Sequence, residues 1–306
     1  METSYTGHYI YNCQEMEYQT GTFGHDLERL RAVEGLEILQ DGDAMIAVSG
    51  VYQGRVFTSS AKGMHGKSYG WFNKEVLDNG LHAERMADLG GESRLWFGPE
   101  FGEFSLCFEK GTEQAHGHIV RPHDLNHKKF TGIKRAANAL VFGSRMELKN
   151  AQDYVFEVDV ERIISLLSKT EIEKNLGIHL SEKTAFVGFN AENKVTNIGA
   201  QQFKKESGLI SIWELGCMLT TSDNCVIIPL TRKTDQITEY FTPIADRMQV
   251  KNNVLFYNAD ANGFNKIGIP PRFCKNIMGS YSPSGDQLNI VTFSFEHDSL
   301  YVNSVP

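Results

Sequence analysis

The stretch Tyr154-Val155-Phe156-Glu157-Val158-Asp159-Val160-Glu161-Arg162 decides the fold class of this 306-residue chain. Apolar and acidic residues alternate strictly in it, with Phe156, Val158 and Val160 on one side and the three acidic residues on the other. An alternation of period two places the two sets on opposite faces of a half-buried antiparallel strand. The stretch therefore predicts a strand with an acidic solvent face.

Short apolar segments of the same kind flank this stretch on both sides. Leu36–Leu39 and Ala44–Val48 surround Asp41-Gly42-Asp43, which predicts a hairpin because a glycine turn between apolar runs favours one. Further strands are expected at Val51–Ser60, Phe104–Phe108, Thr184–Asn190, Asn193–Asn197, Leu209–Leu219, Val226–Leu230, Val254–Asn258 and Leu288–Phe295, with a turn at Pro283–Asp286.

Helix signals are few. One short helix is expected over Asp26–Ala32 with Asp26 as its N-cap, and another over Ser168–Leu176. Many short strands without a low-complexity linker indicate an all-β fold, a single large antiparallel sandwich. We expect residues 1–35 to form an N-terminal extension and residues 36–306 to form one sandwich domain.

The charge balance limits the ligands that the chain can take. It has 30 basic and 38 acidic residues, a net charge of −8, without long runs of one sign. This pattern argues against nucleic-acid binding and favours a neutral or cationic small ligand. The five cysteines (Cys13, Cys107, Cys217, Cys225, Cys274) lack paired metal-type spacing, so we expect buried thiols, no disulfide framework, no metal and no cofactor.

No secretion signal and no apolar stretch of membrane-spanning length is visible in the sequence. We therefore expect a soluble protein without membrane contact, with the cytoplasm as the favoured compartment.

A second stretch, Gly90–Phe104, is the best candidate for a binding site. It contains three carboxylates, one guanidinium, four aromatic rings and four glycines. Aromatic faces beside charged hydrogen-bonding groups suit a saccharide, which offers apolar C–H faces and hydroxyls. The alternative is a glycine-rich hairpin in which Arg94 pairs with Glu92 or Glu100 while Trp96 fills the core.

Two other segments carry residues that need an explanation. Glu214 lies inside an apolar run, so it is expected to be paired or functional, because a lone buried carboxylate is costly. His116 and His118 have a spacing that suits two metal ligands from one strand, although a solvated loop is the simpler interpretation.

Several motifs resemble the galactose-mutarotase-like β-sandwich superfamily and, within it, an uncharacterised bacterial family. They extend from about Leu36 to the C-terminus. The matching pieces are Gln53–Val56, Ser68–Asn73, Gly91–Glu100, Arg162, Val195–Gly199, Gly208–Trp213 and Lys266–Ile269. The resemblance implies an antiparallel supersandwich with a sugar-sized cleft, and proton exchange at the ring oxygen and anomeric hydroxyl of an aldose.

The sequence departs from that family in two places. Mutarotases place a histidine acid on the strand after the Asn-x-Gly turn, where this chain has Ser211-Ile212-Trp213-Glu214. The chain also stops before the further strands that carry the mutarotase glutamate in its relatives, so the domain is expected to lack its last strands.

We therefore expect a carbohydrate-binding protein of mutarotase-like fold, with aldose epimerase activity as its candidate chemistry. The expected catalytic residues are Glu92, Glu100 and His65, and the expected substrate-binding residues are Arg55, Lys67, Trp71, Asn73, Arg94, Trp96 and Lys266. A mono- or oligosaccharide is the expected partner, and the chain is expected to be a monomer or weak homodimer. The alternatives are a non-catalytic sugar-binding module and a glycan-cleaving enzyme that uses two carboxylates.

Overall fold

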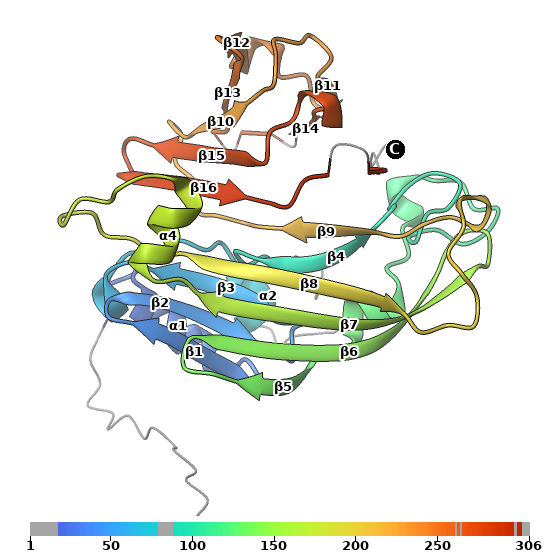
Figure 1. Cartoon of the computed structure of the whole chain (residues 1–306), viewed down its shortest axis with the longest axis horizontal. Helices are drawn as coiled ribbons and strands as arrows, with labels where there is room; N and C mark the ends of the chain where they lie inside the picture. The colour runs from blue at the N-terminus through green and yellow to red at the C-terminus, as the bar shows by residue number, and fades with distance from the viewer. Residues whose placement is uncertain (1–17, 79–87, 261, 264, 297–298, 302–306) are drawn as a thin grey trace, which may run out of the picture. The chain divides into compact units, whose positions relative to one another are not determined.

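The computed structural model describes residues 18–78, 88–260, 262–263, 265–296 and 299–301 (Figure 1). These residues form sixteen strands and four short α-helices, and the strands pair antiparallel. The predicted all-β class is therefore confirmed. The helices are α1 (Phe23–Leu30), α2 (Lys74–Asp78), α3 (His123–His127) and α4 (Lys169–Leu176).

The strands follow one another along the whole described chain. They are β1 (Leu36–Asp41), β2 (Ala44–Ser49), β3 (Arg55–Ser60), β4 (Arg94–Gly98), β5 (Thr131–Arg135), β6 (Ala139–Lys149), β7 (Val155–Leu166), β8 (Phe189–Asn197), β9 (Ser211–Leu215), β10 (Cys225–Pro229), β11 (Thr238–Phe241), β12 (Met248–Lys251), β13 (Val254–Asn258), β14 (Asn265–Gly268), β15 (Ile277–Ser282) and β16 (Gln287–Thr292).

The chain divides into two compact units. Unit 1 consists of Met1–Glu92, Lys129–Gly143 and Glu161–Asn193, and unit 2 of Ser93–Lys128, Ser144–Val160 and Lys194–Pro306. Strands β5, β6, β7 and β8 form a four-stranded sheet in this order, and β6, β7 and β8 each contribute residues to both units. The single domain expected over residues 36–306 stays a prediction.

The first hairpin of unit 1 forms as the sequence predicts. Strands β1 and β2 pair from Leu36 opposite Ser49 to Asp41 opposite Ala44, and Gly42 supplies the positive φ of the turn. Strand β3 adds to β2, but it begins at Arg55 and not at the predicted Val51. The preceding residues cannot extend the strand, because Gln53 and Gly54 both have positive φ angles.

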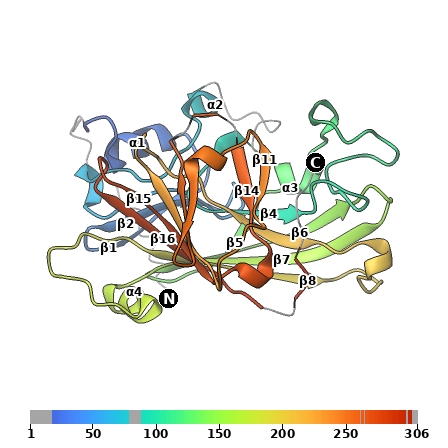
Figure 2. The same cartoon turned by 90° about the horizontal axis from the view of Figure 1, so that it is seen from above.

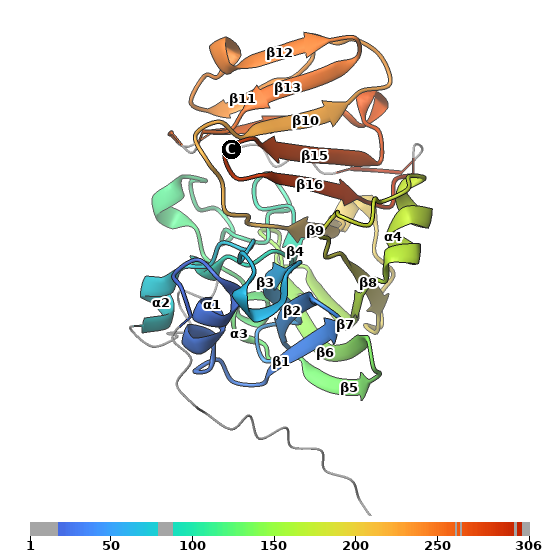
Figure 3. The same cartoon turned by 90° about the vertical axis from the view of Figure 1, so that its left-hand side faces the viewer.

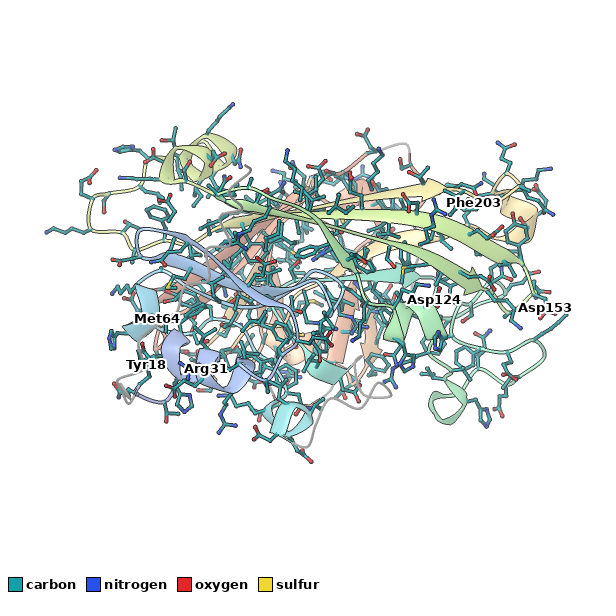
Figure 4. The ribbon with its side chains drawn as sticks, turned by 90° about the horizontal axis from the view of Figure 1, so that it is seen from below. Tyr18, Arg31, Met64, Asp124, Asp153 and Phe203 are labelled. Atoms are coloured by element: carbon teal, nitrogen blue, oxygen red, sulfur yellow. The ribbon has the colours of Figure 1, made fainter. Side chains whose placement is uncertain are left out.

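Helix α1 packs into the core of unit 1. Phe23 and Leu30 belong to a buried cluster with residues of β2 and β3, and Tyr18 and Met64 lie beside the helix in Figure 4. The predicted N-cap, Asp26, is wrong: the side chain of Thr22 caps α1 by accepting from the His25 N–H. Asp26 is instead buried in the first turn.

The alternating stretch that decides the fold class forms the start of β7. Phe156, Val158 and Val160 are buried while Glu157 and Asp159 are exposed, as predicted.

The helix predicted after β7 is also confirmed, as α4. It begins at a capping box: the Ser168 side chain accepts from the Glu171 N–H, and the Glu171 side chain accepts from the Ser168 N–H.

In unit 2, the strands β12, β13, β10, β15 and β16 lie side by side in this order (Figure 3). Strands β11 and β14 form a separate pair (Figure 2), and β4 pairs with β9. The strands predicted around residues 226–230, 254–258 and 288–295 are confirmed as β10, β13 and β16.

Two strand predictions are wrong. Phe104–Phe108 is a loop, because its backbone groups bond to scattered partners and not to one neighbouring strand. The N–H of Leu106 donates to Pro99, whereas the carbonyl oxygens of Ser105 and Cys107 accept from Ala151 and Val120. The two strands predicted over residues 184–197 are one strand, β8, which begins at Phe189. Short apolar or alternating runs do not by themselves show where the backbone finds its partners.

A buried arginine connects β7 to the turn before β3. Arg162 is fully buried, and its Nε donates to the carbonyl oxygen of Gly54 at 3.0 Å. Its Nη1 donates to Asn193 Oδ1 at 2.6 Å. One guanidinium therefore joins three segments of unit 1 that are distant in sequence.

We expect Arg162→Leu to lower the free energy of unfolding by about 2 to 4 kcal/mol, because it leaves the Gly54 carbonyl and the Asn193 amide without this donor. Urea unfolding measures the change. Arg145→Leu is the control, because Arg145 is 81% exposed and lies 3.9 Å from Asp159, so it should change stability by less than about 0.5 kcal/mol. Equal effects of the two substitutions would contradict this account.

Candidate functional site

The residues expected from sequence to form the site divide between the two units. Unit 1 holds Arg55, His65, Lys67, Trp71, Asn73 and Glu92, and unit 2 holds Arg94, Trp96, Glu100 and Lys266. The second group gathers around the strand pair β4–β9.

The register of β4 and β9 places two tryptophans together. Trp96 lies directly opposite Trp213, and directly opposite residues of an antiparallel pair point to the same face. Arg94 shares this face because it precedes Trp96 by two residues. The other face of β4 carries Leu95 and Phe97, both almost fully buried.

Trp96 is held by two charged side chains. The Arg94 guanidinium lies over its ring, 4.0 Å from the centroid, and the indole N–H donates to Glu100 Oε1 at 3.0 Å. Trp96 is only 3% exposed, whereas Glu100 is half-buried. The tryptophan therefore fixes the position of a carboxylate that water can reach.

Lys266 reaches the same site from another strand pair. On β14 it lies opposite Tyr240 of β11, and its Nζ is 5.4 Å from the ring centroid of Trp213 and 5.2 Å from that of Tyr240. Burial lowers the pKa of the Lys266 ammonium, and the Glu100 carboxylate acts in the opposite direction. Glu100 is thus close enough to influence this lysine.

Together these side chains form what we call the aromatic–charge cluster. All of its members lie in unit 2. They are Arg94, Trp96, Glu100, Trp213, Tyr240 and Lys266. Sequence reasoning did not assign Trp213 or Tyr240 to the site. The only sequence signal for Trp213 was its place at the end of the Gly208–Trp213 motif, and Tyr240 had none.

Strand β9 is not the buried strand that its apolar run predicts. Partly buried and exposed residues alternate along it, and Glu214 is exposed. The Glu214 carboxylate accepts a hydrogen bond from the Ser93 hydroxyl. It therefore avoids the desolvation cost that a buried carboxylate would bear.

Glu92 lies in a different environment in unit 1. It is 5% exposed, and its carboxyl group accepts from the Ser59 N–H at 2.6 Å and from the Ser59 hydroxyl at 2.9 and 2.8 Å. Burial raises the pKa of Glu92 to about 7, and the bonds from Ser59 act in the opposite direction. These contacts attach the segment before β4 to β3.

Arg55 is also buried in unit 1. It is 0% exposed, and its Nη1 donates to the carbonyl oxygen of Gly90. A Cβ on Gly91 would lie 3.1 Å from the Arg55 side chain, so the backbone passes close to it. Arg55 and Glu92 therefore both hold the segment before β4 against β3.

The remaining predicted residues of unit 1 lie nearer the surface. The exposed His65 ring is 5.2 Å from the Tyr18 ring, and Lys67 forms a backbone bridge with Thr22. Trp71 is 43% exposed, and Asn73 Oδ1 accepts from a backbone N–H at the start of α2. Their roles in binding stay predictions.

The described residues contain no group of three or more His, Cys, Asp and Glu side chains placed to hold a metal ion. Cys107, Cys225 and Cys274 are free thiols, and Cys13 lies outside the described residues. No helix in the described part of the chain has the length and apolar character needed to cross a membrane.

Comparison with known protein families identifies the family of the chain. One family model matches residues 21–306. The chain belongs to this family, which is described as Family of unknown function (DUF6786). A comparison of this DUF6786 chain with curated proteins finds no match.

Among solved structures, the DUF6786 chain is similar to a galactose mutarotase-like protein from Lactobacillus casei ATCC 334. The two are 10% identical with a TM-score of 0.46, over 82% of this chain and 76% of the other. A similarity at this level does not assign an activity to the chain.

The environment of Glu92 predicts a pH dependence of stability. The pKa of this carboxyl is near its ordinary value of 4.5 in the unfolded chain, whereas in the folded chain burial raises it to about 7. The free energy of unfolding should therefore fall as pH rises from 4.5 to 7, by up to about 1.4 kcal/mol per pH unit, and then level off. Glu92→Gln should remove this contribution.

Urea unfolding of wild type and Glu92→Gln from pH 4 to 8 measures the contribution of Glu92 to stability. Glu192→Gln, a change at an exposed glutamate on β8, is the control and should leave the wild-type profile unchanged. Parallel profiles for wild type and Glu92→Gln would show that the folded protein does not hold this proton.

Proposed function

We propose that the protein binds a saccharide at the aromatic–charge cluster. The observation that carries the proposal is the position of Lys266 over Trp213 and Tyr240, with Glu100 close enough to influence it. An ammonium and a carboxylate can bond to hydroxyls, while aromatic rings pack against C–H groups. The motif resemblance to galactose-mutarotase-like proteins agrees with this choice, as an analogy.

The contacts suggest a different role for each tryptophan. Arg94 covers a face of Trp96, which is almost fully buried, so Trp96 holds Glu100 and offers little surface for stacking. Trp213 is only partly buried. We therefore assign the sugar-packing surface to Trp213, and the hydroxyl contacts to Lys266 and Glu100.

Aldose epimerase activity is a second candidate, and the same cluster supports it. Ring opening needs one group that protonates the ring oxygen and another that removes the proton of the anomeric hydroxyl. Glu100 can serve as the base and the Lys266 ammonium as the acid, which would replace the histidine of mutarotases. Glu92 is the less suitable base, because Ser59 donates to both of its carboxyl oxygens.

Trp213→Ala should weaken saccharide binding about tenfold, which corresponds to about 1.4 kcal/mol, the order of one aromatic contact. Saturation-transfer NMR with a panel of aldoses and uronic acids identifies the ligand, and calorimetry measures the dissociation constant. Trp71→Ala is the matched control, because this tryptophan is exposed in unit 1, and it should leave binding unchanged. Loss of saccharide binding with Trp71→Ala, without a loss with Trp213→Ala, would place the site in unit 1.

If the protein is an epimerase, Glu100→Gln should abolish anomer exchange while the melting temperature stays nearly unchanged. Exchange is followed by NMR on freshly dissolved sugar. Glu103→Gln is the control, since it removes a neighbouring exposed carboxylate. Binding without accelerated exchange by wild type would identify a non-catalytic module instead.

A further inference from the structure

We propose that the saccharide carries an anionic group, a carboxylate, sulfate or phosphate, that binds the Lys266 ammonium. This inference rests on the proposed function and names the class of ligand for the same cluster.

The Lys266 ammonium has aromatic rings as its neighbours. It lies over the rings of Trp213 and Tyr240, and among the described residues it has no hydrogen-bond acceptor and forms no ion pair. An ammonium has three N–H donors, and ring faces satisfy its charge only in part. A half-buried ammonium of this kind is completed by an oxyanion.

Lys74 offers a comparison within the same chain. Lys74 also lies over an aromatic ring, 5.8 Å from the centroid of Phe72, but its Nζ bonds to Asp26 Oδ1 at 2.9 Å. There the protein supplies a carboxylate to a lysine that contacts a ring. At Lys266 we assign the role of this carboxylate to an anionic group of the ligand.

The charges within the cluster also favour an anionic ligand. The cluster contains two cations, Arg94 and Lys266, and one carboxylate, Glu100, which already accepts from the Trp96 indole. Glu239 adjoins Tyr240 on β11, but it lies opposite Ile267, on the other face from Lys266, and bonds to the Ile244 N–H. The cluster is therefore positive, although the whole chain has a net charge of −8. Because of this local positive charge we assign an anionic ligand here, in place of the neutral or cationic ligand expected from the net charge of the whole chain.

The test compares sugars that differ only in their acid group. The probes are D-glucose with D-glucuronate, D-galactose with D-galacturonate, and D-glucose with glucose 6-phosphate, each titrated by calorimetry at low and high salt. Inorganic phosphate is the control without a sugar. We expect an acidic sugar to bind wild type about tenfold or more tightly than its neutral partner, with the preference reduced by salt.

Lys266→Met should abolish this preference, because the charge-assisted contact is lost, and it should weaken the binding of neutral sugars less than that of acidic ones, since neutral sugars lose only a hydroxyl contact. Lys266→Arg should keep most of the preference for acidic sugars, which separates loss of charge from misfolding. Lys251→Met on β12 is the control, because Lys251 is an exposed lysine of unit 2 outside the cluster, and it should behave as wild type.

Two outcomes would overturn the inference and leave the proposed function standing: neutral sugars bind as tightly as acidic ones, or Lys266→Met keeps the preference. Failure of every sugar to bind would overturn both. Inorganic phosphate that binds as tightly as the sugar phosphate would show a bare anion site and contradict saccharide recognition.

Discussion

The register of β4 against β9 is the constraint on which the candidate site depends. It sets Trp96 opposite Trp213, so that one face of the pair carries both indoles and Arg94. A slip of β4 by one residue would move Arg94 and Trp96 to the other face, because side chains alternate along a strand. Leu95 and Phe97 oppose such a slip, since their burial on the far side of β4 would be lost.

Much of the fold could be predicted because local pattern and tertiary contacts agree there. In β7, each residue predicted to face the core, such as Val158, is buried. The turn at Gly42 and the capping box at Ser168 likewise depend on neighbouring residues only. Phe104–Phe108 was misjudged because its backbone bonds to several separate segments of the chain, which its composition does not reveal.

The site could be predicted only in part, because its residues come from segments distant in sequence. Arg94, Trp96 and Glu100 lie in one short stretch, and their residue types alone made them candidates. Trp213 and Tyr240 join them through strand pairing, which no local pattern encodes. Sequence also treated Glu92 and Glu100 alike, whereas burial raises the pKa of Glu92 and Glu100 remains accessible.

The central claim, that a saccharide binds at the aromatic–charge cluster, can be tested with the indole N–H signals of the protein. The chain has only three tryptophans, Trp71, Trp96 and Trp213, so nitrogen-15 NMR gives three signals that single substitutions assign. On titration with the bound sugar, we expect the signals of Trp213 and Trp96 to shift and saturate together while that of Trp71 stays in place. A shift of Trp71 alone, with the other two unchanged, would contradict it.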